Sequence, residues 1–125
     1  MRWLVDGMNV IGSRPDGWWR DRRGAMKRLI AELERFAEAT GDEVAVVFDG
    51  RPFEFEDGGE LDVGFAPGGR NAADHVIADR VAADDDGGSI TVVTSDAELE
   101  RAVRGHGADV LGSGAFRRRL DAPTR

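Results

Sequence analysis

The sequence predicts an α/β fold in which a mainly parallel central sheet lies between two layers of helices. Three observations lead to this prediction. Apolar runs of strand length alternate along the chain with segments whose apolar residues repeat at helical spacing. Two of the runs, EVAVVFD and SITVVTSD, are continuously apolar over most of their length, as expected for strands buried on both faces. Alternating strands and helices are typical of parallel sheets covered on both sides through right-handed crossovers.

The first half of the chain supplies a strand, a helix and two further strands. Residues 3–5 predict a short first strand, and apolar residues at helical spacing predict a helix over residues 24–40 that Gly41 ends. EVAVVFD at residues 43–49 predicts the second strand. A glycine-rich acidic connection then leads to LDVGF at residues 61–65, a weaker strand candidate.

The second half continues the alternation. In chain order we expect a helix over residues 71–83, the solvated loop DDDGG, the buried strand SITVVTSD, the short helix AELERAVR stopped by glycine, the short strand DVLG, and a final turn or helix capped by Ser113. No internal repeat divides the chain, and its 125 residues are expected to form one domain over residues 1–125.

Composition limits the cofactor and the compartment. Cysteine is absent, so a metal would need oxygen ligands or the two histidines, His75 and His106, and oxygen ligands favour Mg²⁺ or Mn²⁺. No apolar stretch approaches the roughly 20 residues that cross a bilayer, and the N-terminus carries no export signal. We therefore expect a cytoplasmic protein without a membrane partner, as a monomer or weak homodimer.

The distribution of charge favours local rather than general binding of nucleic acid. A formal net charge of −7 opposes long-range attraction to phosphate. Between the first strand and the first long helix, however, cationic and flat aromatic side chains suited to single-stranded RNA lie together. The candidate RNA-binding residues are Arg14, Trp18, Trp19, Arg20, Arg22 and Arg23, with Arg70 before the second helix as a further phosphate contact. The alternative is a loop entering a helix, with both tryptophans packed on the core.

Three of the predicted strands deliver an aspartate to the same edge of the sheet. These residues are Asp6, Asp49 and Asp96. Any one of them alone is commonly a turn residue or a helix cap. Three carboxylates at equivalent strand ends repel one another unless a cation or a shared proton intervenes. The carboxyl edge of such a sheet is also where ligands bind, near the point where the strand order reverses. A divalent-metal site therefore explains the set best.

A fourth carboxylate and several uncharged polar side chains are expected near these three. Asp74 lies near the start of the second long helix, where an aspartate also suits the helix dipole. Asp79 follows five residues later and is expected at the surface. An all-oxygen cluster that binds Mg²⁺ or Mn²⁺ supports hydrolysis of a phosphodiester. Asn9, with Ser95 or Thr94, can then orient a water or hold a carboxylate.

Four motifs make the sequence resemble the NYN-domain family of PIN-like metal-dependent ribonucleases, in particular its YacP-like branch. In family order they are VDGMNVIG at residues 5–12, VVFDG at 46–50, NAADHVI at 71–77 and VVTSD at 92–96. The resemblance covers nearly the whole chain. It implies a PIN-like three-layer fold and endonucleolytic cleavage of RNA, with messenger RNA as a substrate and, in some members, action at the ribosome. It places the acidic site on Asp6, Asp74 and Asp96, with Asp49 as a further acidic member and with Asn9 and Ser95 in support.

The chain departs from this family pattern at three positions. Met8 stands where an aromatic residue is common, Ala78 stands where a further acidic residue is common, and His75 replaces an acidic or polar residue. The first departure leaves the role of Met8 open, and the second leaves open whether the site holds one metal or two. We expect His75 at the helix surface.

Rival functions differ in the residues that they require. A non-catalytic RNA-binding module would tolerate loss of the acidic residues, and all four are present. A phosphatase with Asp6 as nucleophile commonly uses an aspartate two positions later as acid and base, where this chain has Met8. A nucleotide-binding Rossmann domain is disfavoured because GxGxxG is absent after the first strand.

Overall fold

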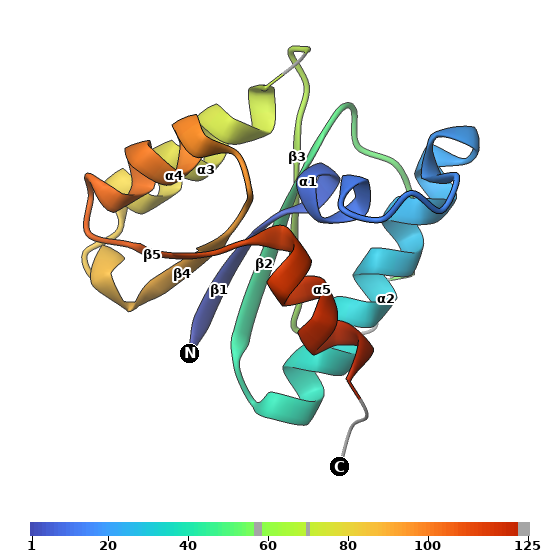
Figure 1. The fold of residues 1–125 in the computed structure, drawn as a ribbon, viewed down its shortest axis with the longest axis horizontal. Helices are drawn as coiled ribbons and strands as arrows, with labels where there is room; N and C mark the ends of the chain where they lie inside the picture. The colour runs from blue at the N-terminus through green and yellow to red at the C-terminus, as the bar shows by residue number, and fades with distance from the viewer. Residues whose placement is uncertain (57–58, 70, 123–125) are drawn as a thin grey trace.

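The computed structural model describes residues 1–56, 59–69 and 71–122, in which strands and helices alternate as the sequence predicts (Figure 1). The strands are β1 (Arg2–Asp6), β2 (Glu43–Asp49), β3 (Asp62–Ala66), β4 (Ile90–Val93) and β5 (Asp109–Leu111). The α-helices are α1 (Gly7–Gly12), α2 (Arg22–Thr40), α3 (Ala72–Ala83), α4 (Ala97–Arg104) and α5 (Ser113–Asp121), and single 3-10 turns are η1 (Trp18–Arg20) and η2 (Gly87–Ser89). No helix of the described chain is long and apolar enough to span a membrane.

The strands form one parallel sheet in the order β3-β2-β1-β4-β5. At its centre, Val5 of β1 pairs with Val46 of β2 on one side and with Val93 of β4 on the other. Helices α1, α2 and α5 cover one face of this sheet, and α3 and α4 cover the other (Figure 1). The predicted three-layer α/β/α fold is therefore confirmed.

Two apolar cores, one on each face, hold the layers together. Along β1, Trp3 and Val5 pack on the side of α1, α2 and α5, in the cluster that includes Phe116. Leu4 lies between them in sequence and packs on the opposite face, in the cluster that includes Ile77 of α3. Because successive strand residues point to opposite faces, a sheet buried on both sides needs apolar residues at consecutive positions. This requirement explains the continuous apolar runs of the strand sequences.

Helix α2 agrees with the helix predicted over residues 24–40 and begins two residues earlier. The Asp21 side chain provides the reason, since its Oδ1 accepts a hydrogen bond from the N–H of Gly24 at 3.0 Å and caps the helix. At the other end Gly41 adopts φ 74° and donates its N–H to the carbonyl of Ala37 at 2.9 Å. The predicted glycine stop is therefore confirmed.

Three connections differ from the prediction. The chain enters α1 directly after Asp6, where no helix is predicted from the sequence. Strand β4 ends at Val93, so Asp96 follows the strand by three residues instead of ending it. Ser113 is the first residue of α5, whose N-cap position is held by Gly112, so the expected capping role of Ser113 is wrong.

Tertiary contacts explain two of these differences. In α1, Val10 and Ile11 are buried in the core, which stabilises a helix of six residues that is too short to form alone. After β4, the N–H of Thr94 still donates to the carbonyl of Leu111 on β5, but its side chain turns toward Asp6 of β1. The strand therefore ends where the chain enters the polar carboxyl edge of the sheet.

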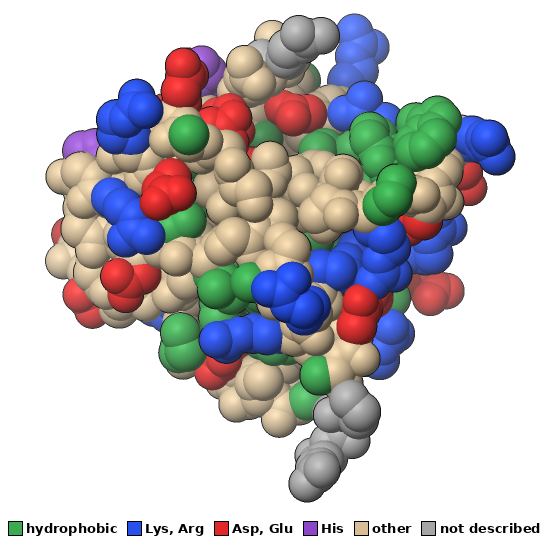
Figure 2. Space-filling model, viewed as in Figure 1, with side chains coloured by type: hydrophobic (Ala, Val, Ile, Leu, Met, Phe, Trp, Pro, Cys, Tyr) green, Lys and Arg blue, Asp and Glu red, His purple; other side chains and the backbone are tan. Residues whose placement is uncertain are grey.

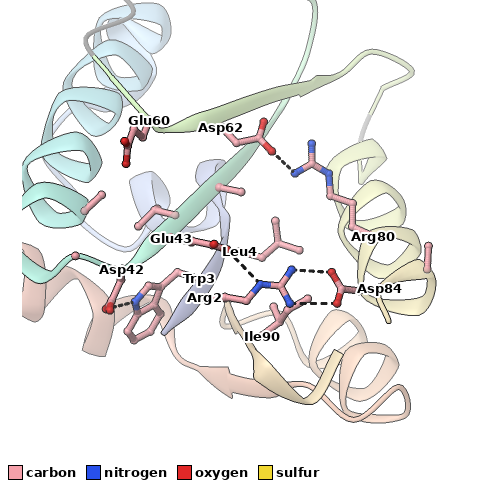
Figure 3. Close-up of a pocket in the computed structure, with 15 residues that line it drawn as sticks. Arg2, Trp3, Leu4, Asp42, Glu43, Glu60, Asp62, Arg80, Asp84 and Ile90 are labelled. Atoms are coloured by element: carbon pink, nitrogen blue, oxygen red, sulfur yellow. Dashed lines mark hydrogen bonds and ion pairs between the residues drawn. The ribbon is translucent and has the colours of Figure 1, made fainter. Parts of the chain in front are cut away.

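The opposite edge of the sheet, where the strands begin, is held by charged pairs around a cavity of about 680 Å³ (Figure 3). The two Nη atoms of Arg2 bind both carboxylate oxygens of Asp84, at 2.7 and 3.1 Å. Nη1 of Arg2 also donates to Oγ of Ser89 at 2.8 Å. The hydrogen bonds from Arg2, with a further one from the N–H of Asp86 at 2.8 Å, lower the pKa of Asp84 to about 2. The DDDGG segment is thus tied to β1 through its first aspartate, and is not only a solvated loop.

We expect Arg2→Gln to lower the melting temperature by a few degrees at pH 7 and to have little effect near pH 2. The folded-state pKa of Asp84 is depressed, so the ion pair contributes stability above the unfolded-state pKa of about 4, and this contribution is lost as pH falls toward 2. Thermal unfolding between pH 2 and 7 measures the effect. Arg80→Gln, which removes a single 3.2 Å contact to the exposed Asp62, is the matched control and should shift the melting temperature less.

Candidate active site

The candidate site lies at the carboxyl edge of the sheet, where the strand order reverses. From β1 the chain moves outward through β2 to β3, and it then returns to place β4 and β5 on the other side of β1. The crevice at such a reversal is the usual ligand site of an open α/β sheet. Asp6 ends β1 at this point, directly beside the end of β4.

Asp6 is buried, with 4% of its surface exposed. Its Oδ2 accepts a hydrogen bond from Oγ1 of Thr94 at 3.0 Å. Burial, and to a smaller extent the negative charges of Asp74 and Asp49, raise the pKa of Asp6 to about 7 against the opposing hydrogen bonds from Thr94 and the backbone of Asn9. A carboxylate in these surroundings is costly unless it binds a proton or a cation.

Asp49 and Asp74 approach from the neighbouring strand and helix. Asp49 ends β2, and its Oδ1 accepts a hydrogen bond from the N–H of Ala73 at 2.9 Å, at the start of α3. Asp74 lies in the first turn of α3, as predicted. Burial raises the pKa of Asp74, and the charges of Asp96 and Asp49 raise it further, while His75 acts in the opposite direction. The carboxylates of Asp6, Asp49, Asp74 and Asp96 therefore interact electrostatically at the carboxyl edge of the sheet.

Asp96 is also a helix cap. Its Oδ1 accepts a hydrogen bond from the N–H of Leu99 at 2.9 Å at the start of α4, and its own N–H donates to Oγ1 of Thr94 at 3.1 Å. Thr94 thereby links Asp96 to Asp6, to which it donates. The capping and the functional explanations of Asp96 are compatible, because each uses a different oxygen of the carboxylate.

A hydrogen-bond network joins three distant segments beside the acidic residues. Oδ1 of Asn9 accepts from the N–H of Ser95 at 2.9 Å and from Oγ of Ser113 at 2.6 Å. The N–H of Ser113 donates to Oγ of Ser95 at 2.9 Å. Both acceptor bonds fall on the carbonyl oxygen of Asn9, which leaves its amide nitrogen as the polar atom that can serve the site. The network fixes α1, the loop after β4 and the start of α5 to one another.

The donor set suits a hard divalent cation, although the side chains are not gathered around one point. Carboxylate oxygens are the protein ligands that Mg²⁺ and Mn²⁺ prefer, and Mg²⁺ is usually held by one or two of them with several waters. Within the described ranges, no three Asp, Glu or His side chains lie close enough together to hold one ion directly. Asp6 carries the burial and the negative neighbours that a cation would neutralise. The residues therefore fit an ion that is bound by few carboxylates and completed by water.

The predicted RNA-binding residues separate into different environments. Trp18 is half-buried and packs against the core, whereas Trp19 is 57% exposed, so the alternative in which both tryptophans pack on the core holds for Trp18 and not for Trp19. Arg14 pairs with Asp121 of α5. Arg23 lies over the ring of Phe53, 5.1 Å from its centroid. The remaining predicted side chains are Arg20 and Arg22, which are exposed, and Arg70, which lies outside the described residues.

Sequence reasoning missed two contributors and left one residue open. Ser113 was assigned to a helix cap, and its link to Asn9 spans 104 positions, which no local pattern signals. Glu98 raises the pKa of Asp74. It follows Asp96 by two residues, and the acidic first turn of α4 is the sequence feature that could have identified it. Met8 packs against the core on the side of α1, which gives the residue a structural role. His75 is exposed, as expected.

Comparisons with known proteins agree with this architecture. The family model described as the YacP-like NYN domain matches residues 3–125. A crystal structure of Rae1 (YacP) from Bacillus subtilis is similar with a TM-score of 0.79 and 27% identity, and the similarity covers 97% of this chain and 74% of that one. A crystal structure of a mutant of the same Bacillus subtilis protein gives a TM-score of 0.77 and 26% identity with the same coverage. No curated protein matches the sequence.

Proposed function

Because the chain belongs to the YacP-like NYN-domain family, a family of nucleases, we propose that it is a metal-dependent endoribonuclease that hydrolyses phosphodiester bonds of single-stranded RNA. The observation that carries the proposal is the buried Asp6 at the reversal of strand order, whose pKa is raised to about 7 by burial and by its acidic neighbours. A buried carboxylate with a strongly perturbed pKa in a crevice is a functional-site candidate.

In this proposal Asp6, Asp74 and Asp96 hold Mg²⁺ or Mn²⁺, some of them through bound water because no three described side chains lie close enough to bind one ion directly, and Asp49 contributes directly or through water. The bound ion would supply an activated water and would neutralise the charge of the transferred phosphate. The hydroxyl of Thr94 fixes Asp6 and Asp96 relative to each other, because it donates to Asp6 and accepts from the N–H of Asp96. Such partners of metal ligands fix the orientation of the ligands.

Asn9 and Ser95 position the substrate side of the site. The Asn9 carbonyl is held by Ser95 and Ser113, so its amide group is fixed in direction and can donate to a water or a phosphate oxygen. Exposed Trp19 and the arginines around it offer stacking surface and charge for unpaired RNA. RNA is therefore the partner that we propose.

The second candidate is a non-catalytic RNA-binding module, and one observation favours it. The Oδ1 atoms of Asp49 and Asp96 both accept hydrogen bonds from helix N–H groups. A module without activity would keep these two aspartates for the helices that they cap. Such a module would bind RNA equally well with and without a divalent ion and would not cleave it.

Cleavage of single-stranded RNA with Mn²⁺, with Mg²⁺ and with chelator tests the proposal. We expect internal cleavage with either ion, none with chelator, and a loss of about 100-fold or more in Asp96→Asn. Asn retains a side-chain oxygen that can cap α4, so the variant should fold, and circular dichroism checks this. Cleavage that persists in chelator or in a folded Asp96→Asn protein would refute the metal mechanism. Binding without cleavage under all conditions would identify the non-catalytic module.

A further inference from the structure

A groove of about 320 Å³ opens beyond the C-terminal end of α1, between the segment that follows α1, helix α2 and helix α5. Its polar lining is dominated by arginine. Figure 2 shows Lys and Arg side chains gathered over α2 and α5 on this face of the molecule. The arginines that line the groove are Arg14, Arg28, Arg35 and Arg117.

The groove is locally cationic on a protein with a net charge of −7. Its four arginines meet three acidic residues, which are Asp16 and Glu32 in the lining and Asp121, the partner of Arg14. Arg117 is 12% exposed and donates from Nη1 to Glu32 at 2.8 Å, and its buried Nε lacks a hydrogen-bond partner within the described residues. Arg28 and Arg35 are exposed, and neither forms an ion pair in the part of the chain that the structure describes. Positive charge is therefore left over for an anionic ligand.

The spacing of these charges suits an extended polyanion better than a small anion. Arg28 and Arg35 lie seven residues apart on α2, which is two helical turns and about 10 Å. Two positions this far apart along a helix can each meet a different phosphate of one strand, and Arg binds phosphate through a planar fork of N–H donors.

The groove and the candidate active site lie at opposite ends of the short helix α1. Helix α1 begins directly after Asp6 and is six residues long, about 9 Å, and Ile11 near its end lines the groove. The half-buried Trp18 lines the same groove and offers an aromatic surface beside the arginines. Bases of a single strand stack on such surfaces while the backbone follows the charges.

We propose that this groove binds the backbone phosphates of a single-stranded RNA whose adjoining segment lies in the acidic site. The proposal rests on the proposed function for the placement of the scissile bond, but the binding itself does not require cleavage. It assigns phosphate contacts to the exposed Arg28 and Arg35, which extend the set of Arg14 and Trp18 along α2, while Arg117 stays paired with Glu32.

Fluorescence anisotropy with labelled oligouridylates of about 4 and about 16 nucleotides, in chelator and over a range of salt concentrations, tests the groove. The variant is Arg28→Gln/Arg35→Gln, which removes two exposed cations. We expect it to bind the long probe about tenfold more weakly at low salt, with a slope of log K against log salt that is shallower by about 1.4. The short probe should bind the parent chain more weakly than the long probe and should lose less affinity in the variant, because it offers fewer phosphates to the groove.

The matched control is Arg101→Gln/Arg104→Gln on α4, which changes the net charge equally on the other face of the sheet. It should bind both probes like the parent chain. An equal loss in both double variants would mean a nonspecific charge effect and would overturn the proposal, as would unchanged binding in the groove variant. Displacement of the long probe by polyglutamate at equal charge concentration would point to an acidic protein partner and would also overturn it.

Binding and cleavage measured together distinguish a failure of the groove assignment from a failure of the proposed nuclease activity. If the parent chain binds the long probe through Arg28 and Arg35 but cleaves nothing with Mn²⁺ or Mg²⁺, the groove assignment stands and the nuclease assignment fails. If the parent chain cleaves RNA and the groove variant binds and cleaves as well as the parent, the groove assignment fails alone.

Discussion

Asp6→Asn is expected to be more stable than the parent chain at pH 8 in chelator, and to lose RNA cleavage in the presence of Mn²⁺. The free carboxylate of Asp6 is buried, and its pKa is raised to about 7 by burial and by the charges of Asp74 and Asp49. Asparagine has nearly the same shape, carries no charge and can still accept the hydrogen bond from Thr94. The gain has an upper limit of about 4 kcal/mol in the free energy of unfolding.

The sign of this effect depends on pH. A carboxyl group whose folded-state pKa lies above its unfolded-state value keeps its proton longer in the folded state. Between the ordinary value of 3.8 and about 7, the folded chain binds more protons than the unfolded chain, so this group makes stability fall as pH rises. The Asp6→Asn variant lacks this dependence. Its advantage should therefore be close to zero near pH 4, grow up to pH 7 and remain constant above it.

Urea unfolding in chelator at several pH values measures the advantage. Asp79→Asn, at an exposed position of α3, is the matched control and should alter the unfolding midpoint little at any pH. Adding Mn²⁺ should stabilise the parent chain by mass action and stabilise Asp6→Asn less, because the variant lacks one of the anionic ligands. An Asp6→Asn protein that is less stable than the parent at pH 8 in chelator would contradict the assignment of a costly buried carboxylate.

A residue whose removal stabilises the chain but abolishes activity is a mark of functional constraint. The same reasoning separates Asp6 from Asp49 and Asp96. The latter two accept hydrogen bonds from helix N–H groups, so each has a structural role that can account for its presence. Asp6 interacts favourably with the Thr94 hydroxyl and the backbone N–H of Asn9, but burial and the neighbouring negative charges outweigh both and raise its pKa. It is therefore the member of the set that folding alone explains least well.

How much the sequence predicts depends on whether local or distant contacts determine an element. Strand β2 has the bounds expected from EVAVVFD because a continuous apolar run is a local signal. The carboxyl-edge positions of Asp6, Asp49 and Asp74 likewise follow from the alternation of strands and helices. Helix α1 escapes prediction because six residues cannot nucleate a helix without the packing of the rest of the chain. Ser113 escapes because its partner, Asn9, is distant in sequence.

The largest loss of stability is expected from Gly7→Ala, at the junction of β1 and α1. A Cβ at this position would lie 2.5 Å from two ring carbons of Phe48 and 3.0 Å from Cγ2 of Val46. Phe48 is fully buried, so its ring has little room to move. Overpacking of this kind typically costs about 1–3 kcal/mol, and this contact lies at the severe end of the range. Urea unfolding should show a lower midpoint with an unchanged slope.

Gly12→Ala is the matched control, because nothing lies within 4 Å of a Cβ at the other end of α1. It should be neutral or slightly stabilising, since alanine favours a helix over glycine. A smaller side chain opposite Gly7 should relieve the clash, so Gly7→Ala combined with Phe48→Leu should cost less than the sum of the two single variants. Additive losses would contradict the close approach. Because this approach sets where α1 starts, the Gly7→Ala protein should also lose RNA cleavage at temperatures where it remains folded, as Asn9 is displaced from Ser95 and Ser113.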